Sequence, residues 1–245
     1  MSNNQIKRQS ERGNVLFLIL IAVALFAALS YVVTQSTRSG GGSTEREKNI
    51  LSSAQMTQYP TALRTAIIRQ VLGGVAIENV LFNAPGTFGA STNLEVFHPS
   101  GGGATYQQAP ADLSAGGNSG LTWTYNGEFD VPGIGLDGAG GNDVIAFLPG
   151  VSSGICRQVN EELGINVSGC TAGATFPSSV PMVANATTAL VDTNMITGYT
   201  FPTTDRPDIT GPAGCVTVFD RQASGCFAEN TPSTRFTFYS VLLER

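Results

Sequence analysis

Residues Val15–Val33 read VLFLILIAVALFAALSYVV, and this stretch decides how the chain is organised. None of its residues is charged, and only Ser30 and Tyr31 carry a hydroxyl group. A helix rises about 1.5 Å per residue, so the run would span roughly 28 Å, close to the hydrocarbon thickness of a bilayer. Polar residues do not recur at the spacing of a half-buried soluble helix. The run therefore predicts a helix that crosses a membrane.

Basic residues precede this run, at Lys7, Arg8 and Arg12. Positive charge beside a span is held on the cytoplasmic side, so we expect a cytoplasmic N-terminus and an exported remainder. Three interpretations compete: a secretory signal cleaved after Ser30, an uncleaved anchor, and an anchor processed at its cytoplasmic end. A cleaved signal has an apolar run of about 7–15 residues. The present run is longer, which favours the two interpretations in which the chain keeps its apolar helix.

A short basic leader ends at Arg12-Gly13, and the apolar run follows with only Asn14 between. This arrangement resembles the N-terminal segment of type IV pilins and pseudopilins. The resemblance implies that a prepilin peptidase cleaves between Gly13 and Asn14 on the cytoplasmic side. It also implies that the apolar helix stays as a membrane anchor and packs in a filament core. The anchor begins Val15, Leu16, Phe17, Leu18 and ends at Val33.

The fifth residue after the expected cut is Leu18. Most major pilins carry a Glu there, which pairs with the N-terminal amine of a neighbouring subunit, whereas some minor pilins and tip pseudopilins lack it. The resemblance therefore implies a minor or tip subunit, non-enzymatic, of a type IV pilus or type II secretion assembly. Its implied partners are the prepilin peptidase and other pilin-like subunits, and its implied location is the bacterial inner membrane, single-pass, with the domain periplasmic or extracellular. The alternative is a bitopic periplasmic binding module, unrelated to filaments, that recognises a surface, a glycan or a protein.

We expect four regions along the chain: a basic leader over 1–13, a transmembrane helix over 14–35, a Gly/Ser linker over 36–43 and an exported globular domain over 44–245. The linker reads STRSGGGS, which predicts a helix end and a flexible joint. Thr44 and Glu47 have the spacing of a capping box, and Pro60 should kink or break the following helix near Tyr59. The expected apolar face of that helix comprises Ile50, Leu51, Ala54, Leu63, Ile67 and Val71.

The exported part predicts an α+β fold: an amphipathic helix, then a loop-rich antiparallel sheet with a second short helix. We expect strands at 121–125, 143–148, 216–219 and 236–243, the last two able to pair as a hairpin. The second helix should span 152–163 and end at Gly164-Ile165 in a Schellman motif.

Four cysteines occur, none of them in C-x-x-C spacing, which argues against zinc ribbons and thioredoxin-type motifs. In an exported domain an even number predicts disulfides. Three connectivities are possible, and pairing of nearest neighbours predicts Cys156–Cys170 and Cys215–Cys226.

Composition limits the chemistry that the chain can perform. Charged residues make up 13% of the chain and the net charge is −5, so nucleic acid is not an expected partner. The single histidine, His98, makes a His-based catalytic or metal site hard to build, and nucleophile motifs are absent, so we expect no enzyme. No cofactor is expected, with calcium as the one option. Its candidate ligands are Asp137, Asn142 and Asp143, which place hard oxygens in a Gly-rich loop.

Overall fold

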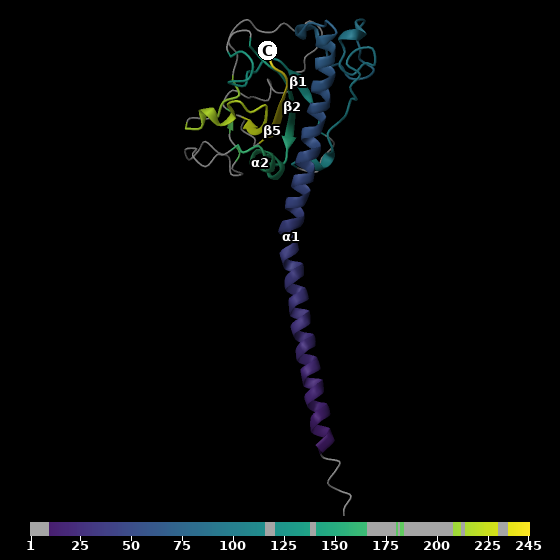
Figure 1. Ribbon diagram of the computed structural model, residues 1–245, viewed down its shortest axis with the longest axis vertical. Coiled ribbons are helices and arrows are strands. Elements are labelled where there is room, and N and C mark those ends of the chain that lie inside the picture. Colours follow the sequence, from purple (N-terminus) through teal and green to yellow (C-terminus); the bar gives the residue numbers. More distant parts are fainter. Residues whose placement is uncertain are drawn as a thin grey trace, which may run out of the picture. The chain divides into compact units, whose positions relative to one another are not determined.

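The computed structural model describes residues 10–115, 121–137, 141–165, 180, 182–183, 208–211, 214–229 and 235–245. Of residues 10–14, 36–43 and 182–183 it describes the backbone alone. The chain divides into two compact units, Met1–Lys48 and Asn49–Arg245. The first helix, α1, spans Ser10–Leu72 and contributes residues to both units (Figure 1).

The Gly-rich stretch 36–43 lies inside α1, so the helix end expected there is wrong. Thr44 likewise lies within the helix and is not its N-cap residue. Glycine disfavours a helix by only about 1 kcal/mol per residue, and it keeps both backbone hydrogen-bonding groups. Extending an existing helix is far easier than nucleating one. Helical segments on both sides therefore carry the helix through three consecutive glycines.

Pro60 also lies in the interior of α1, and the helix continues past it to Leu72. The predicted break near Tyr59 is therefore not found. Proline in a helix interior removes one backbone hydrogen bond and costs about 3 kcal/mol. Tyr59 and Pro60 are both buried, so packing of this turn against the core offsets that cost.

Within the unit Asn49–Arg245, α1 buries a stripe of residues spaced three or four apart, which form one face of a helix. The predicted face is correct at Leu63 and Ile67, which are fully buried, but wrong at Ile50 and Leu51, which are 43% and 62% exposed. The stripe begins one to two turns later than expected and consists of Met56, Tyr59, Leu63, Ala66 and Ile67.

Five strands form one sheet in the order β1-β2-β5-β4-β3. The first four in this order pair antiparallel, and the two-residue β3 pairs parallel with β4. The predicted α+β class and the antiparallel sheet are therefore confirmed. The strands are β1 (Thr124–Asn126), β2 (Val144–Val151), β3 (Met182–Val183), β4 (Ser224–Glu229) and β5 (Phe236–Leu243).

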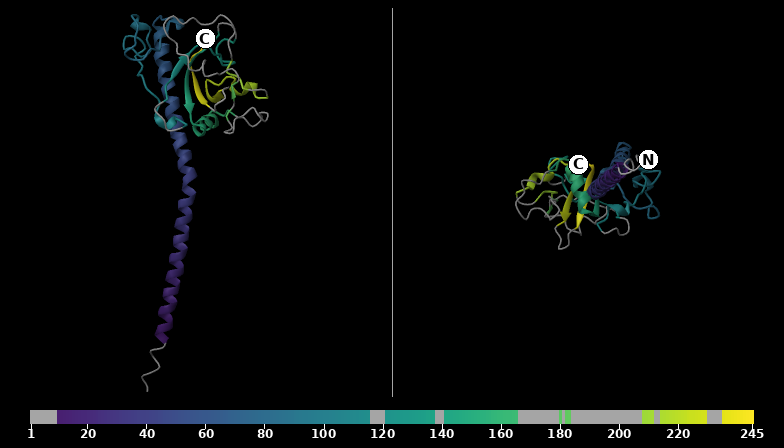
Figure 2. Two further views of the ribbon diagram at one scale, coloured as in Figure 1. Left: turned by 180° about the vertical axis from the view of Figure 1, so that it is seen from behind. Right: turned by 90° about the horizontal axis from the view of Figure 1, so that it is seen from below.

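Both faces of the sheet are buried, which is why β2 and β5 are nearly continuous apolar runs. Successive side chains of a strand point to opposite faces, and β2 places Ala146 in one hydrophobic cluster and Phe147 in the other. The first cluster also contains the buried stripe of α1 and residues of the second helix, α2 (Ser153–Glu162). The ribbon in Figure 2 shows the part of α1 after Asn49 running alongside the sheet. The second cluster also contains residues of segment 129–134, Ile209 and Phe219.

Helix α2 spans Ser153–Glu162, as the sequence predicts. The Ser152 side chain accepts a hydrogen bond from the Ile155 N–H at the N-terminus. At the other end, the Gly164 N–H donates to the Glu161 carbonyl and the Ile165 N–H donates to the Asn160 carbonyl. These two bonds form the predicted Schellman motif, and Gly164 has the positive φ of 72° that the motif requires.

Four one-turn 3₁₀ helices complete the described elements: η1 (Ile77–Asn79), η2 (Thr92–Leu94), η3 (Ala111–Leu113) and η4 (Val216–Phe219). The strand expected over 216–219 is wrong, because η4 occupies it. Phe219 is fully buried while Val216 is 52% exposed, so this segment anchors one side chain and does not alternate as a strand does. The partners of β5 in the sheet are β2 and β4.

Candidate functional site

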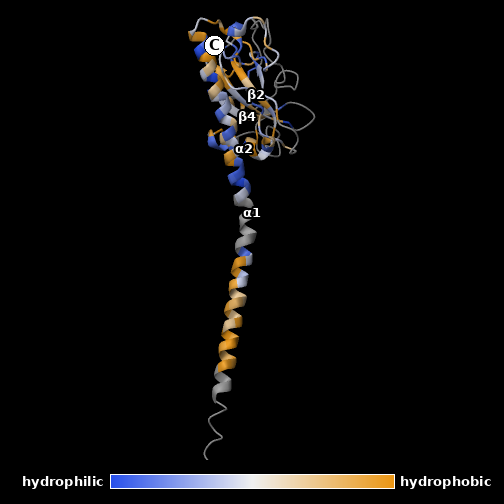
Figure 3. Cartoon of the chain, turned by 90° about the vertical axis from the view of Figure 1, so that its right-hand side faces the viewer, coloured by the Kyte–Doolittle hydropathy of each residue, from blue (hydrophilic) through white to orange (hydrophobic). Residues whose placement is uncertain are grey.

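The apolar segment Val15–Gln35 is long and apolar enough to cross a membrane by its length and composition. Figure 3 shows most of it as a hydrophobic stretch of α1, with paler and blue turns toward its C-terminal end. Its side chains are exposed within their own unit, including the predicted anchor residues Val15, Leu16, Phe17, Leu18 and Val33. A signal sequence near the N-terminus can meet the same requirement of length and composition.

The few polar side chains of this segment are hydrogen-bonded within the helix. Ser30 Oγ donates to the Phe26 carbonyl at 2.8 Å, and Thr34 Oγ1 donates to the Ser30 carbonyl at 2.7 Å. At its end, Gln35 Nε2 donates to the Tyr31 hydroxyl at 2.8 Å. A polar group in hydrocarbon must find its partner within the protein. These bonds meet that requirement without a second chain.

The predicted processing residues Gly13 and Asn14 belong to α1, and the structure describes only their backbone. The basic residues Lys7 and Arg8 also lie outside them. The predicted cleavage therefore stays a prediction.

A pocket of about 670 Å³ lies in the unit Asn49–Arg245 between α1 and the segment around η3. One wall comes from α1, where Gln55, Gln58, Tyr59 and Ala62 recur at intervals of three or four and so share a side of the helix. Binding pockets for small ligands have volumes of about 300–1,000 Å³. The rest of the lining consists of Met56, Gln107, Gln108, Ala109, Pro110, Leu113 and Trp123.

The aromatic part of this lining is fixed by its contacts. The rings of Tyr59 and Trp123 lie 5.3 Å apart between centroids, and Trp123 packs edge-on against Phe238 at 6.1 Å. The Tyr59 hydroxyl lies 3.4 Å from the Tyr125 hydroxyl and accepts a hydrogen bond from the Gln107 N–H at 3.2 Å. Burial raises the pKa of Tyr59 and of Tyr125, so both phenols stay protonated at neutral pH.

Sequence reasoning missed this pocket because three distant segments build it. The available signals were two pairs of glutamines, Gln55 with Gln58 and Gln107 with Gln108, and the single tryptophan of the chain. None of these signals places the segments next to one another without the fold.

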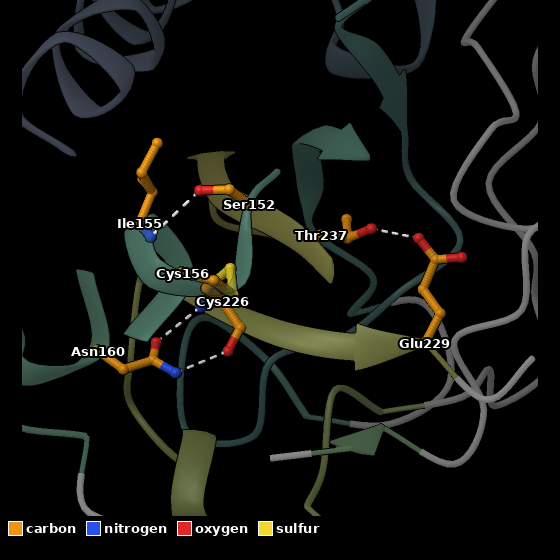
Figure 4. Close-up of a disulfide and its surroundings, with 7 residues drawn as sticks. All are labelled: Ser152, Ile155, Cys156, Asn160, Cys226, Glu229 and Thr237. Carbon is orange, nitrogen blue, oxygen red and sulfur yellow. Dashed lines mark hydrogen bonds between the residues drawn. A yellow bond between two sulfur atoms is a disulfide. The ribbon is translucent and has the colours of Figure 1, made fainter. Parts of the chain in front are cut away.

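The disulfide of the described residues joins Cys156 of α2 to Cys226 of β4, with 5.3 Å between their Cα atoms (Figure 4). The nearest-neighbour prediction of Cys156–Cys170 and Cys215–Cys226 is therefore wrong. The prediction fails because the fold packs α2 on the face of the sheet to which the Cys226 side chain points. This brings together two cysteines that are 70 residues apart in sequence. Cys215 is also disulfide-bonded, and Cys170 lies outside the described residues.

The three candidate calcium ligands make different contacts. Asp137 Oδ1 accepts a hydrogen bond from the Gly133 N–H at 2.8 Å. The Asp143 carboxylate is fully buried and accepts from the N–H groups of Val131 and Arg245 at 3.2 and 3.4 Å. The Asn142 carboxamide is buried and has no hydrogen-bond partner in the structure.

In the part of the chain that the structure describes, no group of three or more His, Cys, Asp or Glu side chains could hold a metal ion. Calcium binding thus stays a prediction. The pKa of Asp143 is raised to about 7, chiefly by burial and also by the negative charges of Asp130 and Glu244, against the two backbone hydrogen bonds that lower it. This carboxyl group therefore titrates near neutral pH.

The single histidine, His98, takes part in a local turn. Its Nδ1 accepts a hydrogen bond from the Ser100 N–H at 3.1 Å, and its ring packs edge-on against Phe88 at 5.0 Å. These contacts give His98 a structural role in the turn and in local packing. The expectation that the chain is not an enzyme remains a prediction.

No family model, curated protein or solved structure matches this chain.

Proposed function

We propose that this chain is a non-enzymatic, pilin-like or pseudopilin-like subunit, anchored in the bacterial inner membrane as a minor or tip component of a filament or secretion assembly. One observation carries the proposal. Helix α1 contains both an apolar span, Val15–Gln35, and a later stripe that packs on an antiparallel sheet. Pilin-like subunits are built on such a helix, whose first part is an anchor and whose second part belongs to the globular domain.

The course of α1 favours retention of the span over removal of a secretory signal. The competing cut, after Ser30, would fall in the interior of α1, where Ser30 accepts from Thr34 and donates to the Phe26 carbonyl. Cleavage at Gly13 instead removes the basic leader and keeps the whole span. The chain then enters the assembly with its N-terminus at the cytoplasmic face and its domain in the periplasm or outside the cell.

The composition of the span supports a minor role in the assembly. Leu18 occupies the position of the pairing Glu, and the whole segment Val15–Gln35 lacks an acidic residue. An ammonium group buried in hydrocarbon without a partner costs at least a few kcal/mol. The new amine on Asn14 therefore needs either the cytoplasmic interface or an acid from a different subunit.

Membrane fractionation with protease protection tests the anchoring. The full-length chain, expressed in a bacterium, should stay with the inner membrane after alkaline extraction. Protease added to spheroplasts should degrade the domain from 49 onward. A chain that is released into the soluble periplasm, or that is protected from protease in spheroplasts, contradicts the proposal.

A further inference from the structure

Among the residues that the structure describes, the lining of the pocket between α1 and η3 contains no charged side chain. Besides the Tyr59 hydroxyl and the Trp123 indole N–H, the polar side-chain groups of this described lining are the carboxamides of Gln55, Gln58, Gln107 and Gln108. Each carboxamide offers two N–H donors and one acceptor oxygen. All four residues are exposed, and within the described part of the chain none of the four carboxamides has a hydrogen-bond partner. They are therefore available to a ligand that both donates and accepts hydrogen bonds.

The remaining lining is apolar and aromatic. Trp123, Tyr59, Met56 and Leu113 are all at least nine-tenths buried, so they form the floor while the glutamines stand at the rim. The floor is fixed before any ligand arrives, because Tyr59 is hydrogen-bonded at its hydroxyl and Trp123 packs between Tyr59 and Phe238. A preformed floor lowers the entropic cost of binding.

We propose that this pocket binds a neutral oligosaccharide. A sugar presents hydroxyl groups, which both donate and accept, and C–H faces, which pack on aromatic rings. The carboxamides at the rim match the hydroxyl groups, and the apolar side chains of the lining match the C–H groups. The described lining contains no Lys or Arg, which favours a neutral ligand over a phosphate or a carboxylate, because no cationic side chain among these residues would compensate the negative charge.

This inference is independent of the anchoring mechanism proposed above. A glycan-binding pocket needs only the unit Asn49–Arg245, whereas the pilin-like proposal depends on the processing and retention of the N-terminal helix. Either proposal can fail while the other holds. If both hold, the chain presents a sugar-binding pocket on the outer side of the membrane.

The single tryptophan makes the test direct, because Trp123 lines the pocket and no other tryptophan contributes to the fluorescence. The full chain is purified in a zwitterionic detergent, since the sugar headgroup of a maltoside would compete. Maltotriose, cellotriose, N-acetylchitotriose, mannotriose and galactotriose are titrated separately while the fluorescence is recorded. We expect saturable binding of at least one of them.

Two double variants test the rim, Gln55→Ala with Gln58→Ala on α1 and Gln107→Ala with Gln108→Ala on the opposite wall. Each removes two ligand hydrogen bonds and should weaken binding about tenfold. The matched control is Thr61→Ala with Thr65→Ala, two exposed positions of the same helix that do not line the pocket. It should bind within about twofold of the wild type.

Ala62→Phe provides a second, independent test, because Ala62 is an exposed lining residue on α1 and a larger side chain there should block the pocket without entering the core. This variant should abolish binding while near-ultraviolet circular dichroism stays unchanged. Three results would overturn the proposal: no saturable binding of any of the five sugars, full binding by a folded Ala62→Phe variant, or saturable binding of tetra-alanine peptide where every sugar fails.

Discussion

The carboxamide of Asn160 forms two hydrogen bonds with the backbone of Cys226. Its Nδ2 donates to the Cys226 carbonyl at 2.8 Å, and its Oδ1 accepts from the Cys226 N–H at 2.9 Å (Figure 4). The same cysteine is disulfide-bonded to Cys156, one turn earlier in α2. A single residue of β4 is thus held to α2 both covalently and by hydrogen bonds. This contact fixes α2 on the face of the sheet that α1 also covers.

Replacing Asn160 should destabilise the domain strongly. Asn160→Leu leaves a buried N–H and a buried carbonyl of Cys226 without partners, at about 1–3 kcal/mol for each group. We expect a loss of about 2–4 kcal/mol in the free energy of unfolding, measured by denaturant titration of the full chain under oxidising conditions.

Glu161→Ala is the control for this measurement. Glu161 is adjacent in α2, more than half exposed, and its ion pair with Arg157 at 4.0 Å is a surface contact. Its removal should change the free energy of unfolding by less than about 0.5 kcal/mol. Equal effects of the two substitutions would mean that the Asn160–Cys226 contact does not stabilise the domain.

Peptide mapping without reduction should recover Cys156 linked to Cys226. By elimination among the four cysteines of the sequence, Cys170 should be linked to Cys215. The first bridge closes a loop of 70 residues, which corresponds to about 4 kcal/mol in the chain-entropy model. Replacing both Cys156 and Cys226 by Ala should lower the free energy of unfolding by this order. A peptide linking Cys156 to Cys170 would show that the fold around α2 is different.

Asp143 should make the domain less stable as the pH rises toward neutrality. Its folded pKa is about 7, above the 3.8 of an unfolded aspartate, so the folded chain holds this proton more tightly. The resulting stabilisation is complete below about pH 4 and is lost as the pH rises through 7. Between pH 5 and pH 8 the loss from this group should be about 2 kcal/mol.

Asp143→Asn removes the titrating group, so its free energy of unfolding should fall less between pH 5 and pH 8 than that of the wild type. Asp112→Asn is the matched control, because Asp112 is exposed. If the pH dependence of Asp143→Asn equals that of the wild type and of the control, the buried carboxyl group is not the cause.

Local patterns predicted the elements whose signals lie within a dozen residues. Helix α2 was predicted over 152–163, with a Schellman end at Gly164-Ile165, and the structure has this end; the N-cap hydrogen bond of Ser152 was not predicted. Strand β5 was predicted at its observed bounds because its residues are almost all apolar or β-branched. Such elements depend on neighbours in the sequence.

Features that depend on distant residues were missed. Strand β4, SGCFAE, has little β-propensity of its own and forms through pairing with β5 and the bridge to α2. The glycines of 36–43 suggested a helix end because their local cost is visible and the support of the flanking helix is not. The pocket between α1 and η3 was missed because three segments that are distant in sequence form its lining. The resemblance to pilins concerns the first 35 residues, of which residues 1–9 lie outside the described part of the chain.

The chain should not build a filament by itself, because Leu18 cannot pair with the amine of a neighbouring Asn14. The first acidic residue after the span is Glu45, beyond its far end. Electron microscopy of a strain that lacks every other pilin-like gene should show no filaments, while a strain that also expresses a Glu-bearing major pilin serves as the positive control. Long filaments of this chain alone would contradict the minor role.

The N-terminal mass of the chain extracted from membranes tests the central claim most directly. The wild type should begin at Asn14, and Gly13→Leu should keep the leader, because a bulky side chain at the cut blocks a peptidase that requires a small residue. Gln5→Leu, a leader substitution away from the cut, should still give a chain that begins at Asn14. A wild-type chain beginning at Met1, Ser2 or Tyr31, or a Gly13→Leu chain with the same N-terminus as the wild type, would contradict the pilin-like account.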